Sequence, residues 1–467
     1  MLRPLRLLAS IALAAGIARA AAADASPPLN ILLVVADDLG LQVGCYGDPI
    51  ARTPEIDRLA AEGMRFETTY VTQSSCSSSR STILTGLYPH QNGQLGLANR
   101  GYTMRAGIRT LPAMLQAAGY RTGILGKLHV NPEDAFPFDY ADKDVQATRH
   151  VLATAEKADR FWSAEPDRPW FLMVNYFDPH VPFRDQIDGV PEVPFVAANM
   201  VPFPFQQIDT PEQLAYITGY YNGAARVDAG LSLLLRKLNA SGQDERTLVV
   251  FLGDNGPPFV RAKTNVTDAA LHVPLIVRWP GFTDGTPSPA LVSSADLVPT
   301  FRAAAGLPAD RSLPGLSLVP VLKRADAPLR SYLFAEHNAH RRDMYFPERV
   351  VRDDRFKLIV NLEDKRTFGI EVDADPAAKI LTDPEWTDTP AQRALQFLRN
   401  PPPEELYDLQ NDPQEFTNLI DQPEYHEVIV RLRAALQAWR ETTGDPLLDP
   451  SLRAAEKRLH TDAPPGF

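Results

Sequence analysis

The sequence predicts an α/β fold, in which a doubly wound, mostly parallel sheet is followed by a smaller α+β domain. Two apolar runs rich in β-branched residues, Asn30 to Ala36 and Leu248 to Gly253, end abruptly in acidic or amide residues, as buried parallel strands do. Helical patterns alternate with short strand candidates between these runs. Beyond about residue 330 the chain changes to short strand-like pieces, a proline-rich stretch and one helix. We therefore place a large α/β domain at residues 24–330 and a smaller α+β domain at 331–467.

Each element of the larger domain follows from its local pattern. Thr53 precedes Pro54, which is typical of an N-cap followed by proline at the first helical position. Further helices are expected at 111–118, about 142–158 and 211–238, and further strands at 122–125, 170–175 and 273–278. In the smaller domain we expect strands within 331–337 and 356–362 and a helix at about 425–440.

Composition limits the classes of protein to which the chain can belong. It has 467 residues, of which 44% are hydrophobic and 22% charged, which is typical of globular proteins with a large core. The formal net charge is −11. This charge argues against binding to nucleic acid or to an anionic membrane surface. An anionic ligand would therefore have to be held by local groups.

The first 23 residues resemble a secretory signal peptide. Arg3 and Arg6 precede an apolar run at residues 7–18, and small residues follow as far as Ala20 and Ala23. The run is shorter than the roughly 20 residues that cross a bilayer, and the sequence offers no other candidate membrane span. We expect cleavage near Ala20 or Ala23 and a secreted or periplasmic protein.

The chain has two cysteines, Cys45 and Cys76. A disulfide between them is one interpretation for an exported protein. Cys45 lies between turn residues and is better explained as a small buried side chain. Cys76 lies in a serine-rich turn that leads into a helix.

Two pairs of oxygen donors follow the two long strands. Asp37 and Asp38 come directly after the first, and Asp254 and Asn255 directly after the second. Ligands of open α/β sheets bind beyond the carboxyl ends of the strands, so these side chains are expected to meet at one edge. Carboxylate and amide oxygens suit Ca²⁺, with Mg²⁺ less favoured, better than Zn²⁺. Each pair alone could also be a helix cap or a turn.

The segment from Thr72 to Gly86 has the features of an anion site. A helix start near Cys76 would present free backbone N–H groups. Arg80, one turn along that helix, could supply a two-pronged contact to a sulfate or phosphate.

At these residues the sequence resembles the type I sulfatases, whose signature is Cys-x-Pro-Ser-Arg followed by Leu-Thr-Gly. The matching segments are SSCSSSR, ILTG, HQNGQLGL from His90, GKLHV from Gly126, FDPH ending at His180, DNGPPF from Asp254 and ELYDLQNDPQEFTNL. The HQNG, GKLHV and DNGPPF forms resemble the heparan N-sulfatase (sulfamidase) branch. The resemblance implies an alkaline-phosphatase-like fold with a smaller domain that covers the pocket. It also implies that the protein removes sulfate from a sulfated saccharide, foremost the N-sulfate of glucosamine in heparan-type or heparin-type saccharides.

The resemblance also implies roles for individual residues. In the family the cysteine, here Cys76, is oxidised to formylglycine by a formylglycine-generating enzyme, and its hydrate is the nucleophile. Asp37, Asp38, Asp254 and Asn255 would hold Ca²⁺ together with residue 76. The remaining expected roles are charge neutralisation by Arg80, Lys127 and Lys263, protonation of the leaving group by His180, and proton removal from the hydrate by His129. Arg261 is an alternative to Lys263 as the third cation.

Outside the catalytic motifs the expectations are weaker. His340 and Arg349, from the smaller domain, are candidate substrate-binding residues. His90 and Gln91 are expected to shape the loop after the nucleophile helix, and the pair Arg341 and Arg342 to form a solvated face.

Three alternatives stay open at this point. The same chemistry could act on a carbohydrate O-sulfate, or the chain could be a phosphomonoester or phosphonate hydrolase of the same superfamily. Ser78 stands where the signature has proline. Without conversion of Cys76, the chain would be a catalytically silent protein that binds sulfated glycans.

Overall fold

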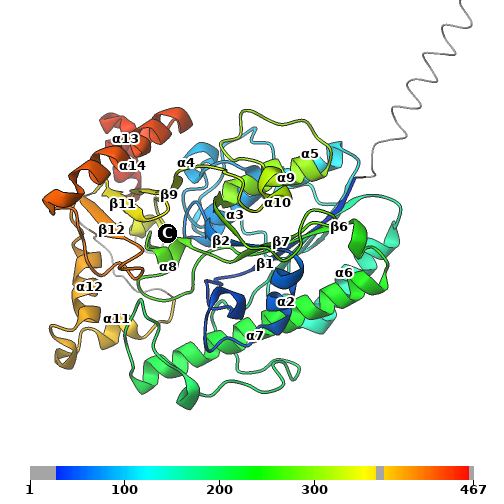
Figure 1. Ribbon diagram of the computed structural model, residues 1–467, viewed down its shortest axis with the longest axis horizontal. Coiled ribbons are helices and arrows are strands. Elements are labelled where there is room, and N and C mark those ends of the chain that lie inside the picture. Colours follow the sequence, from blue (N-terminus) through cyan, green and yellow to red (C-terminus); the bar gives the residue numbers. More distant parts are fainter. Residues whose placement is uncertain (1–27, 364–365, 367–372, 462–467) are drawn as a thin grey trace, which may run out of the picture.

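Two buried parallel strands form the centre of the fold (Figure 1). A computed structural model describes residues 28–363, 366 and 373–461, so the predicted signal peptide lies outside the described residues. Strands β1 (Asn30–Ala36) and β6 (Thr247–Gly253) are buried at every position and pair in parallel, with Ala36 opposite Gly253. Because their carboxyl ends are in register, the residues that follow each strand start from the same edge.

The two strands belong to an eight-stranded sheet in the order β4-β3-β5-β1-β6-β7-β2-β8. Only β7 runs antiparallel to its neighbours, so the sheet is mostly parallel, as predicted. The other strands are β2 (Met64–Tyr70), β3 (Arg121–Gly126), β4 (Tyr140–Asp142), β5 (Trp170–Tyr176), β7 (Leu275–Arg278) and β8 (Ser288–Ser293).

Helices cover both faces of this sheet (Figure 1). Alternate residues of β1 point to opposite faces and enter two separate hydrophobic cores, with Leu32 in one and Leu33 in the other. One face carries α2 (Pro54–Glu62), α6 (Val151–Ala164) and α7 (Pro211–Ala240). The other carries α3 (Cys76–Thr85), α5 (Leu111–Ala117), α9 (Leu297–Ala304) and α10 (Val319–Lys323), and the short helices α4 (Pro89–Asn92) and α8 (Asp268–Leu271) lie in loops.

A second, antiparallel sheet forms the C-terminal part, in the order β12-β11-β10-β9. Helix α13 (His426–Thr443) packs on it through Ile429, Leu432, Leu436 and Trp439. The remaining elements are β9 (Leu333–His337), β10 (Glu348–Arg352), β11 (Phe356–Asn361), β12 (Glu404–Asp408), α11 (Ala377–Ile380), α12 (Pro390–Arg399) and α14 (Pro450–Thr461).

The structure corrects several predicted elements. The helix expected at about 142–158 begins only at Val151, because Asp139 accepts hydrogen bonds from Thr122 and draws residues 140–142 into the sheet as β4. Thr53 precedes α2 as predicted, but its hydroxyl bonds Gly44 and Asp57 instead of capping the helix. Strands β2, β4, β8, β10 and β12 were not predicted.

The described residues contain no helix that is both long and apolar enough to cross a membrane. Both cysteines are free, so the disulfide interpretation is wrong. Cys45 is partly buried and Cys76 fully buried.

Candidate active site

The two predicted pairs of oxygen donors meet at the carboxyl ends of β1 and β6. The backbone N–H of Asp38 donates to Asp254 Oδ1 at 2.8 Å, and Asn255 Nδ2 donates to Asp38 Oδ1 at 2.8 Å. All four side chains, including that of Asp37, are buried. The in-register pairing of the two strands therefore builds the cluster that the sequence predicts.

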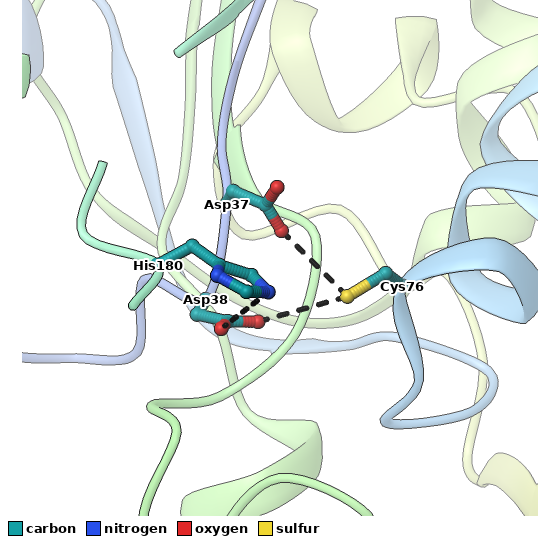
Figure 2. A group of neighbouring side chains, drawn as sticks. All are labelled: Asp37, Asp38, Cys76 and His180. Carbon is teal, nitrogen blue, oxygen red and sulfur yellow. Dashed lines mark hydrogen bonds and ion pairs between the residues drawn. The ribbon is translucent and has the colours of Figure 1, made fainter. Parts of the chain in front are cut away.

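Cys76 faces this cluster from the first residue of helix α3. Its Sγ lies 3.6 Å from Asp37 Oδ1 and 3.8 Å from Asp38 Oδ1. His180 approaches from the other side, with Nε2 3.7 Å from Asp38 Oδ2. Figure 2 shows these side chains pointing toward one another. Each can offer one ligand atom, and the four atoms lie within 4.8 Å of one another.

The donor set fits a hard divalent cation. Asn255 Oδ1 is buried and has no hydrogen-bond partner among the described residues, although the amide nitrogen of the same side chain is fully used. An unpaired buried oxygen is costly unless a ligand satisfies it. Together with the carboxylates of Asp37, Asp38 and Asp254, this oxygen makes an all-oxygen set of the kind Ca²⁺ and Mg²⁺ prefer.

Three buried cations surround the cluster, each joined to a different carboxylate. Arg80 Nε donates to Asp254 Oδ2 at 2.8 Å. Lys127 Nζ donates to Asp37 Oδ2 at 2.6 Å, and Lys263 Nζ to Asp38 Oδ2 at 2.9 Å. Arg261 instead donates hydrogen bonds to the backbone carbonyls of Phe205, Gln414 and Glu415. Lys263, and not its alternative Arg261, is therefore the cation at the site.

These charges displace the pKa values of the two acids at the centre. Burial alone would raise the pKa of Asp37, but the charges of Lys127 and Arg80 outweigh burial and hold it well below its usual range. Burial and the negative charge of Asp37 raise the pKa of Asp254 to about 7. Burial also raises the pKa of the Cys76 thiol. The carboxyl groups of the cluster thus differ in how readily they hold a proton.

The two histidines of the site present different ring nitrogens. His129 Nε2 lies 3.1 Å from Asn99 Oδ1 and donates to it, so the buried Nδ1 carries the lone pair. Burial and the charge of Lys127 lower the pKa of His129 to about 2, which keeps the ring neutral. His180 Nδ1 donates to the carbonyl of Val181 at 2.6 Å, which leaves Nε2 facing Asp38.

A cavity of about 390 Å³ opens above the cluster. His340 lines it, and Ser75 Oγ lies 2.9 Å from its Nδ1; its role in substrate binding stays a prediction. Arg341 also lines the cavity, and its side chain is 42% exposed and pairs with Asp343 at 3.2 Å, which agrees with a solvated position. The wall is formed by Cys76, Leu97, Asn99, Arg100, Lys127, His129, His180, Lys263, Thr264, His340, Arg341, Met344 and Asp373.

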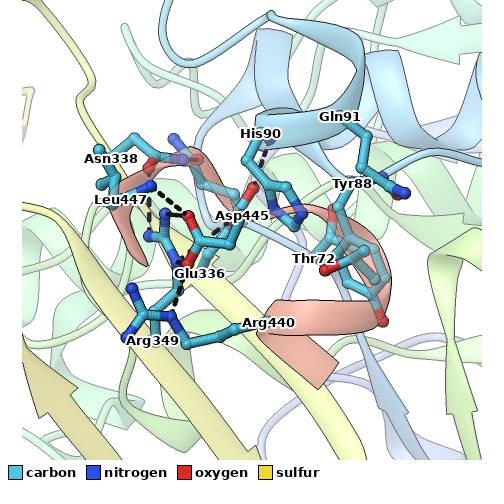
Figure 3. Close-up of polar contacts among 12 residues, drawn as sticks. Thr72, Tyr88, His90, Gln91, Glu336, Asn338, Arg349, Arg440, Asp445 and Leu447 are labelled. Carbon is cyan, nitrogen blue, oxygen red and sulfur yellow. Dashed lines mark hydrogen bonds and ion pairs between the residues drawn. The ribbon is translucent and has the colours of Figure 1, made fainter. Parts of the chain in front are cut away.

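Arg349 does not reach this cavity. Its fully buried guanidinium binds Asp445 through two hydrogen bonds of 2.8 and 2.9 Å and lies 3.7 Å from Glu336 (Figure 3). Glu336 in turn accepts from the backbone and ring of His90. Arg349 is therefore a structural residue, because it is occupied by two internal acids. His90 shapes the loop after helix α3, as predicted.

Two side chains that contact the cations of the site were not predicted from the sequence. Asn175, the sixth residue of β5, accepts from Arg80 Nη1 at 2.6 Å, and a polar residue at the end of a buried apolar strand was a usable signal. Asp373 binds Lys263 Nζ at 2.9 Å from the C-terminal part of the chain. No local pattern around Asp373 indicates this contact, since it spans 110 residues.

Comparison with known protein families gives two matches. The model of the family described as Sulfatase matches residues 29–307. The model described as N-sulphoglucosamine sulphohydrolase, C-terminal, matches residues 262–392. The first match includes Cys76, the three cations and the oxygen cluster, which consists of Asp37, Asp38, Asp254 and Asn255. The second match includes Lys263, His340 and Asp373.

Individual relatives extend over nearly the whole chain. Human N-sulphoglucosamine sulphohydrolase is 32% identical over 478 residues, covering 94% of this chain and 95% of the relative. An ulvan-active sulfatase of Formosa agariphila is 29% identical and covers 89% of this chain and 80% of the relative.

Solved structures share the fold. A protein crystallised with its substrate D-glucosamine-2-N,6-O-disulfate superposes with a TM-score of 0.67 at 20% identity, covering 90% of this chain and 98% of that one. A putative sulfatase from Bacteroides thetaiotaomicron gives a TM-score of 0.69 at 21% identity, covering 91% of this chain and 96% of that one. Because the Sulfatase model matches more than half of the sequence and the human relative matches nearly all of it, this chain belongs to the sulfatase family of hydrolases.

Proposed function

We propose that this chain hydrolyses the N-sulfate of glucosamine in heparan-derived or heparin-derived saccharides. One observation carries the proposal. Cys76 faces the oxygen cluster, and the cavity above them is lined by cations and histidines. The relation to human N-sulphoglucosamine sulphohydrolase over 94% of the chain supports the substrate class. In this reaction R–NH–SO₃⁻ and water give R–NH₃⁺ and SO₄²⁻.

The proposal includes two groups that the chain must acquire. Oxidation of Cys76 to formylglycine would supply a hydrated aldehyde as nucleophile at the position of the sulfur, and the proposed partner in this maturation is a formylglycine-generating enzyme. Asp37, Asp38, Asp254 and Asn255 would hold Ca²⁺, which supplies a Lewis acid for the sulfate oxygens.

Three cations of the chain are placed to receive the sulfate group. Lys127 and Lys263 line the cavity with their ammonium groups fixed on Asp37 and Asp38. Arg80 Nη2 is buried with no hydrogen-bond partner among the described residues, 3.8 Å from Asp37 Oδ2. Donors that are fixed before the reaction stabilise developing charge without reorganising.

The two histidines fit opposite proton transfers. When protonated, His180 can donate from Nε2 to the departing nitrogen, because its Nδ1 is already fixed by Val181. His129 presents its unpaired Nδ1 as an acceptor for the hydroxyl of the hydrate while Asn99 holds Nε2, and its lowered pKa keeps the ring in the unprotonated form that this role requires. These are general acid and general base roles for rings of defined orientation.

An O-sulfatase is the second candidate, and one observation favours it. Two ulvan-active sulfatases of Formosa agariphila align over 89% of this chain, so the same scaffold serves other sulfated polysaccharides. Cys76, the oxygen cluster and the cations would act on sulfur in the same way in both cases.

Measuring sulfate release distinguishes N-sulfate hydrolysis from O-sulfate hydrolysis. The protein, co-expressed with a formylglycine-generating enzyme and loaded with Ca²⁺, is given N-sulfoglucosamine and glucosamine 6-O-sulfate in parallel. Release from the N-sulfate is expected, and Cys76→Ala should abolish it. Release from the 6-O-sulfate alone would replace the proposal with the O-sulfatase.

Mass spectrometry of the peptide that contains Cys76 checks the nucleophile, since Ser78 departs from the usual signature. A dominant aldehyde form is expected. A thiol in all of the protein would favour the silent glycan-binding alternative.

We also propose that residues 1–23 direct export and are removed, giving a secreted or periplasmic enzyme. The support is the apolar run after Arg3 and Arg6. Sequencing of the mature N-terminus should find it close to Ala20 or Ala23, and a retained Met1 would contradict export.

A further inference from the structure

Asp373 is an acid on the wall of a cavity that must accept an anion. The side chain is 22% exposed, and Oδ2 accepts from Lys263 Nζ at 2.9 Å. No group within residues 28–363 and 373–461 donates to its Oδ1. The carboxylate therefore has an oxygen available to a ligand in the cavity.

Lys263 does not need Asp373 as a counterion. Each of the three cations of the site already has one carboxylate partner, and Asp38 serves Lys263 at 2.9 Å. Lys263 has a second one at 2.9 Å, which comes from a distant part of the chain, whereas the second carboxylate of Arg80 belongs to the cluster itself and lies 3.8 Å away. A further negative charge beside the sulfate position opposes sulfate binding. The acid is accounted for if the ligand brings a hydrogen-bond donor, such as a hydroxyl or a nitrogen, or a positive charge to it.

An N-sulfate brings a hydrogen-bond donor as the substrate and a positive charge as the product. The sulfamate nitrogen carries a hydrogen that the bridging oxygen of an O-sulfate lacks, and the product amine is an ammonium ion at neutral pH. Asp373 stays ionised there, because the charges of Lys263 and His180 outweigh burial and lower its pKa to about 2.

Asp373 and His180, the proposed proton donor, line the same cavity. Lys263 Nζ contacts both Asp38 Oδ2 and Asp373 Oδ2. The same Asp38 oxygen lies 3.7 Å from His180 Nε2, the proposed proton donor to the departing nitrogen. Asp373 and His180 are thus both near neighbours of one Asp38–Lys263 ion pair.

We propose that Asp373 is the residue by which this site selects N-sulfates over O-sulfates, since its carboxylate accepts the sulfamate N–H and then binds the ammonium group of the product. This inference rests on the proposed N-sulfate hydrolysis. It assigns the selectivity to one acid of the C-terminal part and not to the metal cluster.

Binding measurements on Ca²⁺-loaded protein separate this role from a merely structural one. In Asp373→Asn, we expect the affinity for glucosamine to fall at least tenfold, while the affinity for inorganic sulfate stays equal or rises because a repelling charge is gone. Glucose, which has no amine, should bind the two proteins equally. Asp373→Ala should repeat the pattern, and Asp354→Asn, at an exposed acid that does not line this cavity, should leave all three affinities unchanged.

Other outcomes overturn the inference. A fall in sulfate affinity would show that Asp373 only orients Lys263. Unchanged glucosamine affinity, with wild-type protein that hydrolyses N-sulfoglucosamine, would overturn the role of Asp373 and leave the proposed function standing. Wild-type protein that releases no sulfate from N-sulfoglucosamine overturns the proposed function and this inference with it.

Discussion

Asp254 connects three parts of the site through a single carboxyl group. Its two oxygens accept from the Asp38 backbone and from Arg80 Nε, and the side chain is fully buried. Burial and the charge of Asp37 raise its pKa to about 7. A carboxyl group that ligates a cation must first lose its proton, so protons and the proposed Ca²⁺ would compete at this residue.

We therefore expect Ca²⁺ affinity to weaken as the pH falls below about 7, because more Asp254 then carries a proton, and Ca²⁺ binding to release protons near neutral pH. Titration calorimetry in buffers of different ionisation enthalpy measures both effects. Asp254→Asn should remove this pH dependence and lower turnover by about 10²-fold or more, with an unchanged circular dichroism spectrum. Affinity that is constant from pH 6 to 8 would contradict the assignment.

At the scale of elements, a glycine at the end of β3 sets the position of the cation that follows it. Gly126 has a φ of +82°, and a Cβ there would lie 2.5 Å from the Asn175 carbonyl oxygen. Lys127 comes next and reaches Asp37, while Asn175 supports Arg80. The close approach of β3 and β5 thus places two cations at once.

Gly126→Ala should cost about 3 kcal/mol or more of unfolding free energy and lower kcat/KM by about 10²-fold, since small displacements of catalytic groups are that costly. Gly119→Ala is the matched control. Gly119 also has a positive φ, +89°, but nothing lies within 4 Å of its Cβ position. We expect it to cost about 1 kcal/mol with full activity, as measured by urea unfolding and sulfate release. Equal activity of the two variants would show that the contact with Asn175 is unimportant.

At the scale of the whole molecule, a buried network connects the second sheet to the segment that follows helix α3 (Figure 3). Glu336 of β9 binds His90 of α4, and Arg349 of β10 binds Asp445, which also accepts from Arg440 at 2.7 Å. Burial alone would raise the pKa of Asp445, but the charges of Arg349 and Arg440 hold it well below its ordinary value of 3.8. The network stabilises the arrangement of the two sheets only while Asp445 is ionised.

Asp445→Asn should therefore lower the unfolding free energy by about 3 to 5 kcal/mol at pH 7, since it leaves Arg349 without its main partner in a buried site. A carboxyl group with a lowered pKa in the folded state stabilises above about pH 4, and this contribution is lost as the pH falls further. The difference between wild type and variant should shrink toward pH 3. Asp326→Asn, in an exposed ion pair with Arg324, should change stability by less than about 1 kcal/mol at either pH. A difference that does not change with pH would contradict this account.

The sequence alone determined the parts of the protein in which the signal is local. Asn30–Ala36 and the strand before Asp254 were predicted because an unbroken apolar run has few alternatives to a buried strand. The oxygen donors could be predicted as one cluster because parallel strands end at the same edge of a sheet. The identities of Cys76 and Arg80 as site residues followed from their motif.

Only the tertiary structure decided the contacts between distant segments. The sequence could not decide between Lys263 and Arg261, since both are cations in one loop. In the structure Lys263 reaches Asp38, whereas Arg261 donates to backbone carbonyls. Arg349 donates to Asp445, which is 96 residues away in the sequence, and Lys263 donates to Asp373, which is 110 residues away. Side chains whose partners come from distant segments leave no periodic or local signal in the chain, because those partners are selected by the fold and not by their neighbours in sequence.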